Sequence, residues 1–186
     1  MYLKYQRKAK KVNFFFHDGT ERPIQRPKDP STQKAYYSGK KKCHTVKNNL
    51  IINAACKVVL LTASFEGRHH DKKIADMVGY SLPEGSTLYQ DTGFQGFAIP
   101  DVTIIQPKKK QRGGELTEAE KENNRKIAAI RIRVEHAISG VKRYRIVKDK
   151  LRAWKKGFSD LVMETCCGLH NFRLNFRPWC YQNTAI

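Results

Sequence analysis

The sequence predicts an α/β domain in which a mixed sheet is flanked by helices. Short segments rich in β-branched and aromatic residues predict strands in the first part of the chain. Two of these segments follow one another closely, as in an antiparallel hairpin, and later ones alternate with stretches of helical periodicity. A hairpin followed by alternating strands and helices is typical of a mixed sheet with helices on both faces.

The first strand is expected at Val12–Phe16, where VNFFF combines β-branched and aromatic side chains. Prolines and Gly39 within residues 21–40 predict a loop. Two strands follow, at Cys43–Ala54 and Lys57–Phe65, joined by a short turn. The second contains VVLLTASF, which is apolar enough to predict a place at the centre of the sheet.

The middle of the chain predicts one short helix between further strands. Residues 70–78 have the apolar spacing of a helix, and Asp71 stands where its N-cap is expected. An accessory acid at Asp71 is the alternative, and the cap is favoured. Short strands are predicted at Thr87–Gln90, directly before Asp91, and at Val102–Ile105.

Two helices are predicted in the last third. The capping box at Thr117–Glu120 begins the longer one. Its apolar residues recur at spacings of three and four, at Ile127, Ile130, Val134, Ala137 and Val141. The second helix is expected at Ser159–Leu174, with inward-facing Leu161, Val162, Cys166, Leu169 and Phe172. The complete order of elements fits a ribonuclease-H-like core.

Charge is the unusual property of the composition. The chain of 186 residues contains 36 Lys and Arg but only 17 Asp and Glu, which gives a formal net charge of +19. An excess of this size favours a polyphosphate partner. An anionic membrane surface is the competing interpretation, but the sequence contains no long apolar run, signal peptide or lipidation motif. We therefore expect a nucleic-acid partner and no membrane.

The five cysteines predict neither a disulfide framework nor a zinc site. Their number is odd, Cys166 and Cys167 are adjacent, and no C-x-x-C pair occurs. We expect buried or unreactive thiols in a reducing compartment.

Three acids stand apart from the solvated ones as candidate metal ligands. Asp18 follows the FFF strand near its end, and Asp91 ends a short strand before a Thr-Gly turn. Glu135 lies beside Val134, so we expect it at the boundary between core and surface. Phosphodiester cleavage with two metal ions needs hard oxygen ligands collected from distant parts of a chain. The alternative is that the two aspartates form turns and that Glu135 pairs with Arg131.

An ordered set of segments resembles the insertion-sequence transposases. More specifically, the chain is similar to the DDE superfamily endonucleases, a group that includes the Harbinger-like elements. The resemblance runs from about residue 12 to residue 176 and is carried by HDGTERPIQRP (17–27), SGKKKCHTVK (38–47), HDKKIADM (70–77), LYQDTGFQGF (88–97), QPKKK (106–110) and RIRVEHAISGVKRYR (131–145).

This resemblance implies roles for particular residues. It places the catalytic, metal-binding carboxylates at Asp18, Asp91 and Glu135. Many bacterial relatives carry a helix signature of Tyr, Arg, Glu and Lys, whose last three members correspond here to Arg131, Glu135 and Lys142. Ala128 stands at the Tyr position, so a contact made by that Tyr is not expected here. The DNA-binding residues expected from the basic clusters and this helix are Arg131, Lys142, Lys108, Lys109, Lys110, Lys41 and Lys42.

The resemblance further implies metal-dependent DNA strand cleavage and strand transfer with two Mg²⁺ or Mn²⁺ ions. The partners would be double-stranded DNA, as element ends and target, and a homodimer is left open. The expected location is the cytoplasm, associated with the nucleoid in a bacterium, or the nucleus in a eukaryote. A DNA-binding protein that has lost cleavage, whether truncated or domesticated, and a host ribonuclease-H-like nuclease remain alternatives.

Three regions follow from the resemblance: a basic N-terminal tail at 1–11, a catalytic domain at 12–176 and a C-terminal tail at 177–186. Full-length relatives usually carry a DNA-binding region ahead of the first Asp. The N-terminal tail is interpreted as a remnant of such a region, in a truncated copy or in the second reading frame of a frameshifting element.

Overall fold

The computed structural model describes residues 13–179, so the predicted tail at 1–11 and residues 180–186 lie outside the described residues. A mixed sheet runs through the molecule in the order β2-β3-β1-β6-β7. Strand β1 is antiparallel to β3 and parallel to β6, and β6 is parallel to β7. The strands are β1 (Phe14–Pro23), β2 (Tyr37–Ser38), β3 (Cys43–Asn53), β4 (Val58–Leu61), β5 (Phe65–Glu66), β6 (Thr87–Tyr89) and β7 (Thr103–Ile105).

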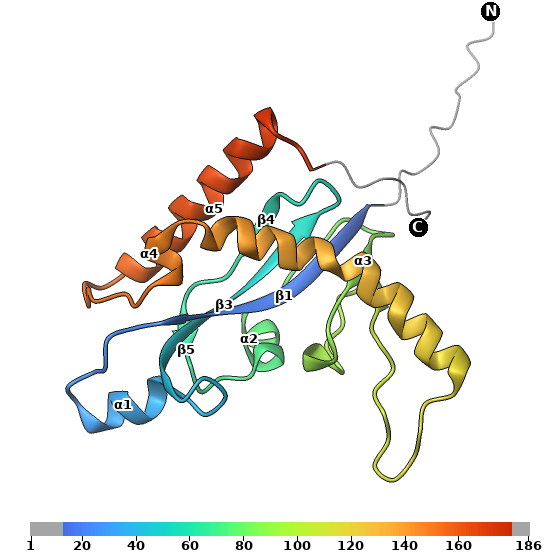
Figure 1. Cartoon of the computed structure of the whole chain (residues 1–186), viewed down its shortest axis with the longest axis horizontal. Helices are drawn as coiled ribbons and strands as arrows, with labels where there is room; N and C mark the ends of the chain where they lie inside the picture. Colours follow the sequence, from blue (N-terminus) through green and yellow to red (C-terminus); the bar gives the residue numbers. More distant parts are fainter. Residues whose placement is uncertain (1–12, 180–186) are drawn as a thin grey trace, which may run out of the picture.

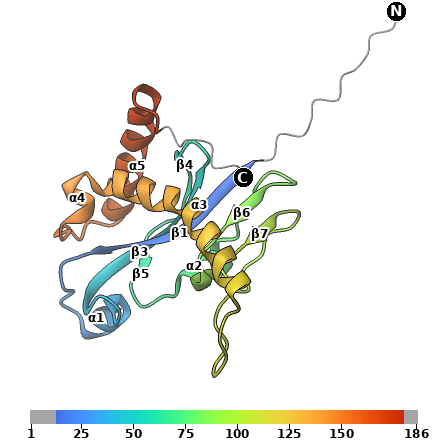
Figure 2. The same cartoon turned by 45° about the vertical axis from the view of Figure 1, so that its right-hand side comes forward.

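Helices lie on both faces of the sheet. Helix α3 crosses one face with α5 beside it, whereas α2 lies on the opposite side (Figures 1 and 2). The strand order and the helices on both faces confirm the predicted ribonuclease-H-like fold. The helices are α1 (Pro30–Tyr36), α2 (Asp71–Val78), η1 (Thr92–Phe94), α3 (Glu118–Lys142), α4 (Arg145–Lys148) and α5 (Phe158–Phe176). Within residues 13–179, no helix is long and apolar enough to cross a membrane.

Alternation along β1 divides the core into two parts. Phe16 packs with Tyr89 and Val134 in the larger cluster beneath α3 and α5. Phe15, its neighbour, packs with Leu88 in the cluster on the α2 side. Because successive side chains of a strand point to opposite faces, Asp18 shares the α3 side with Phe16. The central strand therefore presents its acid to the long helix.

The first strand is longer than predicted. It continues to Pro23 because β3 pairs with it along that whole length, from Phe15 opposite Asn53 to Pro23 opposite Thr45. Asp18 consequently lies inside β1 and not near its end. The predicted loop at 21–40 was also wrong, since it contains the end of β1, β2 and the helix α1 that Asp29 caps by accepting from Thr32 N.

Strand β4 corrects a second expectation. The VVLL segment was predicted at the sheet centre, but in the described part of the chain it pairs only with β3. Val59 is 49% exposed, as expected for an edge strand. The central position belongs to β1, which is bordered by β3 and β6.

The two long helices form as predicted, but α5 turns a different face to the core. Val162 and Cys166 are buried, whereas Leu161, Leu169 and Phe172 are exposed, contrary to prediction. His170 is fully buried and its Nε2 lies 3.1 Å from the carbonyl oxygen of Cys56. A Cβ at Gly140 of α3 would lie 2.5 Å from Nδ1 of that ring. The α3 glycine thus provides the space for His170 and sets the rotation of α5.

Gly67 offers a test of close packing around β3. A Cβ there would lie 2.2 Å from Thr45 Oγ1 and 2.6 Å from the Tyr36 carbonyl oxygen. We expect Gly67→Ala to lower the free energy of unfolding by about 1–3 kcal/mol, the usual cost of overpacking. The matched control is Gly39→Ala, where a Cβ meets nothing within 4 Å. Equal unfolding midpoints of the two variants in urea would contradict this packing.

Candidate active site

Strand register brings Asp18, inside β1, level with Asp91, which lies just beyond the end of β6. The parallel β1–β6 ladder includes the pair Phe16 and Tyr89, whose rings stack at a centroid distance of 5.4 Å. Each acid lies two residues beyond its member of this pair, so both acids are level and on the same face. The short strand predicted at Thr87–Gln90 forms but ends at Tyr89, so Asp91 follows it after the single residue Gln90.

The Asp91 carboxylate is held from two directions. It is the N-cap of η1, where Oδ1 accepts a hydrogen bond of 2.7 Å from the Thr92 backbone N–H. Nη1 of Arg131, on α3, lies 3.4 Å from the same oxygen. The Arg131 side chain is only 11% exposed, whereas that of Asp91 is 48% exposed. A fixed cation thus orients an acid that remains open to solvent.

Of the two acids, Asp18 is the one whose ionised form is disfavoured by its surroundings. Its pKa is raised to about 6, chiefly by burial, and the nearby Asp91 and Asp71 carboxylates act in the same direction. The Gly19 backbone N–H, at 2.8 Å from Oδ1, and the Arg131 charge act in the opposite direction. A carboxylate in such surroundings is stabilised by added positive charge.

The opposite face of β1 beneath the acids is aromatic. His17 is fully buried, and its ring centroid lies 3.9 Å from that of Phe94 in η1. Burial lowers its pKa to about 3, so the imidazole is neutral at physiological pH. Directly after β6, Gln90 accepts a hydrogen bond of 2.7 Å from Gln106 Nε2. This layer packs η1, and therefore Asp91, against the sheet.

Glu135 does not join the two aspartates. It was expected at the boundary between core and surface, but it is exposed. It follows Arg131 by four residues and precedes Lys142 by seven, so all three share one face of α3. Arg131 pairs with Asp91, not with Glu135, in contrast to the turn-and-ion-pair alternative. Among residues 13–179, no group of three or more His, Cys, Asp or Glu could hold a metal ion.

Asp71 is closer to the site than the sequence indicated. The predicted helix cap was wrong: His70 is the N-cap of α2, and Asp71 is the first helical residue. A Cβ at Gly19 would lie 2.7 Å from Asp71 Cγ, so this glycine lets the carboxylate approach β1. Lys47 Nζ is 3.2 Å from Asp71 Oδ1. Only the tertiary structure shows this placement, because the local sequence suits a cap equally well.

The predicted DNA-binding cations fall into two groups. Lys142 reaches from α3 to the Glu21 carbonyl oxygen on β1, at 3.5 Å. Lys41 and Lys42 lie in the turn before β3. The other cluster, Lys108–Lys110, lies in the loop before α3, where Lys108 forms an ion pair with Glu120. The first group is therefore the one beside β1 and the acids.

This fold and this pair of acids agree with the family to which the chain belongs, the DDE superfamily endonucleases. The model of that family matches residues 17–171. DNA substrates and divalent metals are typical of the enzymes of this family.

A relative gives the more particular likeness. The chain is 32% identical over 162 residues to a probable transposase for insertion sequence element IS702 of Microchaete diplosiphon. The matched region is 87% of this chain and 58% of that protein, so the chain spans little more than half the length of this relative. No solved structure matches the chain.

The raised pKa of Asp18 predicts a pH-dependent stability. Between about pH 4 and 6 the folded state holds a proton that the unfolded state releases, so stability falls as pH rises through this range. Above pH 6, in the absence of divalent metal, Asp18→Asn should be more stable than the wild type by up to roughly 3 kcal/mol. Below pH 4 this gain should vanish. Urea unfolding across pH measures it, with the exposed Asp76→Asn as the control variant; a gain independent of pH would argue against a buried Asp18 charge.

Proposed function

We propose that this chain is a transposase catalytic domain that cleaves a DNA strand and transfers the freed end to a target by two-metal phosphoryl transfer. The observation that carries the proposal is the register of β1 and β6, which sets Asp18, inside β1, level with Asp91, two residues beyond the end of β6. Residues 12–176 would form the catalytic unit. It would act on double-stranded DNA at the nucleoid of a bacterium or in the nucleus of a eukaryote. A homodimer that joins two DNA ends is compatible with this role.

The donor chemistry of the site fits Mg²⁺ or Mn²⁺. Asp18 and Asp91 supply hard carboxylate oxygens, which these ions prefer to nitrogen or sulfur. Burial chiefly raises the pKa of Asp18, and repulsion from Asp91 and Asp71 adds to it, so the ionised carboxylate is one that a bound cation would stabilise. Two such ions, when bound, supply Lewis-acid activation of an attacking oxygen and stabilise the charge on the leaving oxygen.

The residues of the chain would divide the remaining work. Asp18 and Asp91 would hold the metals from the sheet, and Glu135, which lies apart from them at an exposed position on α3, would complete the set when metal and DNA are bound. Arg131 orients Asp91 through its contact at 3.4 Å. Lys142, on the same face of α3, binds a phosphate of the DNA. In this arrangement α3 carries both a ligand and the cations that hold the substrate in place.

A DNA-binding protein without cleavage activity is the second candidate. The exposed position of Glu135, apart from the two aspartates, favours it. The two candidates share the fold and the positive charge, and differ only in whether the acids act on DNA.

Nicking of supercoiled plasmid separates the candidates. We expect nicking in Mg²⁺ or Mn²⁺ that chelator abolishes and that Asp91→Asn or Glu135→Gln reduces by about a hundredfold or more, at least the scale of losing a metal-site partner. Asp76→Asn, an exposed change on α2, should nick like the wild type. Binding without nicking by the wild type would instead support the second candidate.

Metal binding can be measured without turnover. A ligand that binds only the folded state stabilises it by about 2.7 kcal/mol at a hundred times its Kd. We expect Mn²⁺ to raise the melting temperature of the wild type and of Asp76→Asn, but not of Asp18→Asn or Asp91→Asn. An equal increase in all four proteins would show that the metal binds elsewhere.

A further inference from the structure

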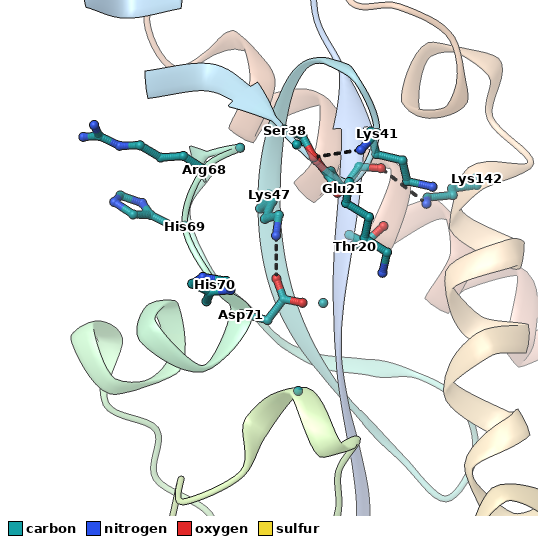
Figure 3. Close-up of a pocket in the computed structure, with 15 residues that line it drawn as sticks. Thr20, Glu21, Ser38, Lys41, Lys47, Arg68, His69, His70, Asp71 and Lys142 are labelled. Atoms are coloured by element: carbon teal, nitrogen blue, oxygen red, sulfur yellow. Dashed lines mark hydrogen bonds and ion pairs between the residues drawn. The ribbon is translucent and has the colours of Figure 1, made fainter. Parts of the chain in front are cut away.

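A cleft of about 530 Å³ opens beside the acids and is not explained by metal binding. Arg68, His69 and His70 line one side, and Lys41 and Lys142 line the other, with β1 and β3 between them (Figure 3). Asp71 and Lys47 point toward one another at its centre (Figure 3).

The cleft has an excess of unneutralised positive charge. Lys40, Lys41, Lys47, Arg68 and Lys142 line it, against the two acids Glu21 and Asp71. Both acids are already engaged: Glu21 Oε1 accepts from Thr45 Oγ1 at 2.6 Å, and Asp71 pairs with Lys47. Arg68 is paired with Glu66 at 3.0 Å, whereas within residues 13–179 Lys40, Lys41 and Lys142 have no carboxylate at ion-pair distance. Such a lining attracts an anion.

The lining favours a sugar–phosphate backbone over a base. Within the described chain, no Phe, Tyr or Trp side chain lines the cleft, so the rings that face it are the two small imidazoles of His69 and His70 and not the larger aromatic rings on which bases usually stack. Gly39 and Gly93 also line it, and a Cβ at either would meet nothing within 4 Å. No packing inside the fold requires these glycines, and their missing side chains leave the wall open to a close ligand.

The position and the size of the cleft fit one strand of DNA. The cleft begins at Gly19 and Gly93, which lie one and two residues from Asp18 and Asp91. Its volume falls within the roughly 300–1,000 Å³ of small-ligand pockets, which accommodates a nucleotide or two and not a duplex. A ligand here would therefore lie next to the acids.

We propose that this cleft binds the phosphodiester backbone of a single DNA strand, separated from its complement, next to the bond that is cut. The position of the cut bond rests on the proposed function, whereas the strand binding itself does not. DNA would then have to open locally at the site, and Lys41, Lys142 and Arg68 would hold the released strand by its phosphates.

Charge changes in the cleft test this proposal by fluorescence anisotropy without divalent metal. The probe is a short labelled single-stranded oligonucleotide. Gly39→Asp adds an acid to open space and Arg68→Gln removes a cation. The matched controls are Gly168→Asp, at an equally open position on α5, and Lys126→Gln, at an exposed position on α3.

Each phosphate contact with single-stranded DNA changes the slope of log Kd against log salt concentration by about 0.7. Loss of one contact therefore weakens binding about fivefold at 0.1 M salt. We expect each cleft variant to lose about fivefold or more, and each control less than twofold, roughly the effect of charges not in contact. An oligonucleotide with uncharged methylphosphonate linkages should bind the wild type weakly and be insensitive to the cleft variants. A blunt duplex should be less affected than the single strand.

Two results would overturn the proposal: cleft variants that bind the single strand like the wild type, or equal losses for single strand and duplex, which would indicate only a general charge effect. Binding and nicking are measured separately. Cleft-dependent binding by a wild-type protein that does not nick would leave the strand site standing and refute the nuclease.

Discussion

The parallel pairing of β1 with β6 is the constraint on which the site depends. It places two acids that are far apart in the sequence level with one another, because each lies two residues beyond the stacked pair Phe16 and Tyr89. The surrounding structure holds this pairing in place: β3 supports the other edge of β1, and α3 covers the face that bears Asp18. Arg131 then connects that helix to Asp91. Fold and site are therefore consequences of the same register.

Much of this arrangement could be predicted from local patterns. The FFF segment, the apolar run of β3 and the capping box of α3 each determine their element through nearby residues, and all three formed. Asp18 and Asp91 could be singled out because each accompanies a strand. The order of the elements then indicated a mixed sheet with helices on both faces and fitted a ribonuclease-H-like core, although several folds share that order.

The rest depended on contacts between segments distant in the sequence, which local periodicity does not encode. Asp71 suits a helix cap by type, and only the absence of a side chain at Gly19 allows it to approach β1. The inward face of α5 is chosen by the fit of His170 against Gly140, a pairing that the apolar residues of α5 do not reveal. Glu135 was expected nearer the core because its neighbour Val134 is buried, but adjacent helical residues point in different directions.

The short β1–β6 ladder has a consequence for which length changes the chain can accept. A strand alternates its faces with every residue, so one residue added or lost between Tyr89 and Asp91 would turn this acid toward the aromatic layer on the α2 side. The same change between Phe16 and Asp18 would turn Asp18 toward the α2 side in the same way. The long segment between β7 and α3 lies outside this register and ends in its own capping box. Insertions and deletions in relatives should therefore accumulate there, while the two short intervals that precede the acids keep their lengths.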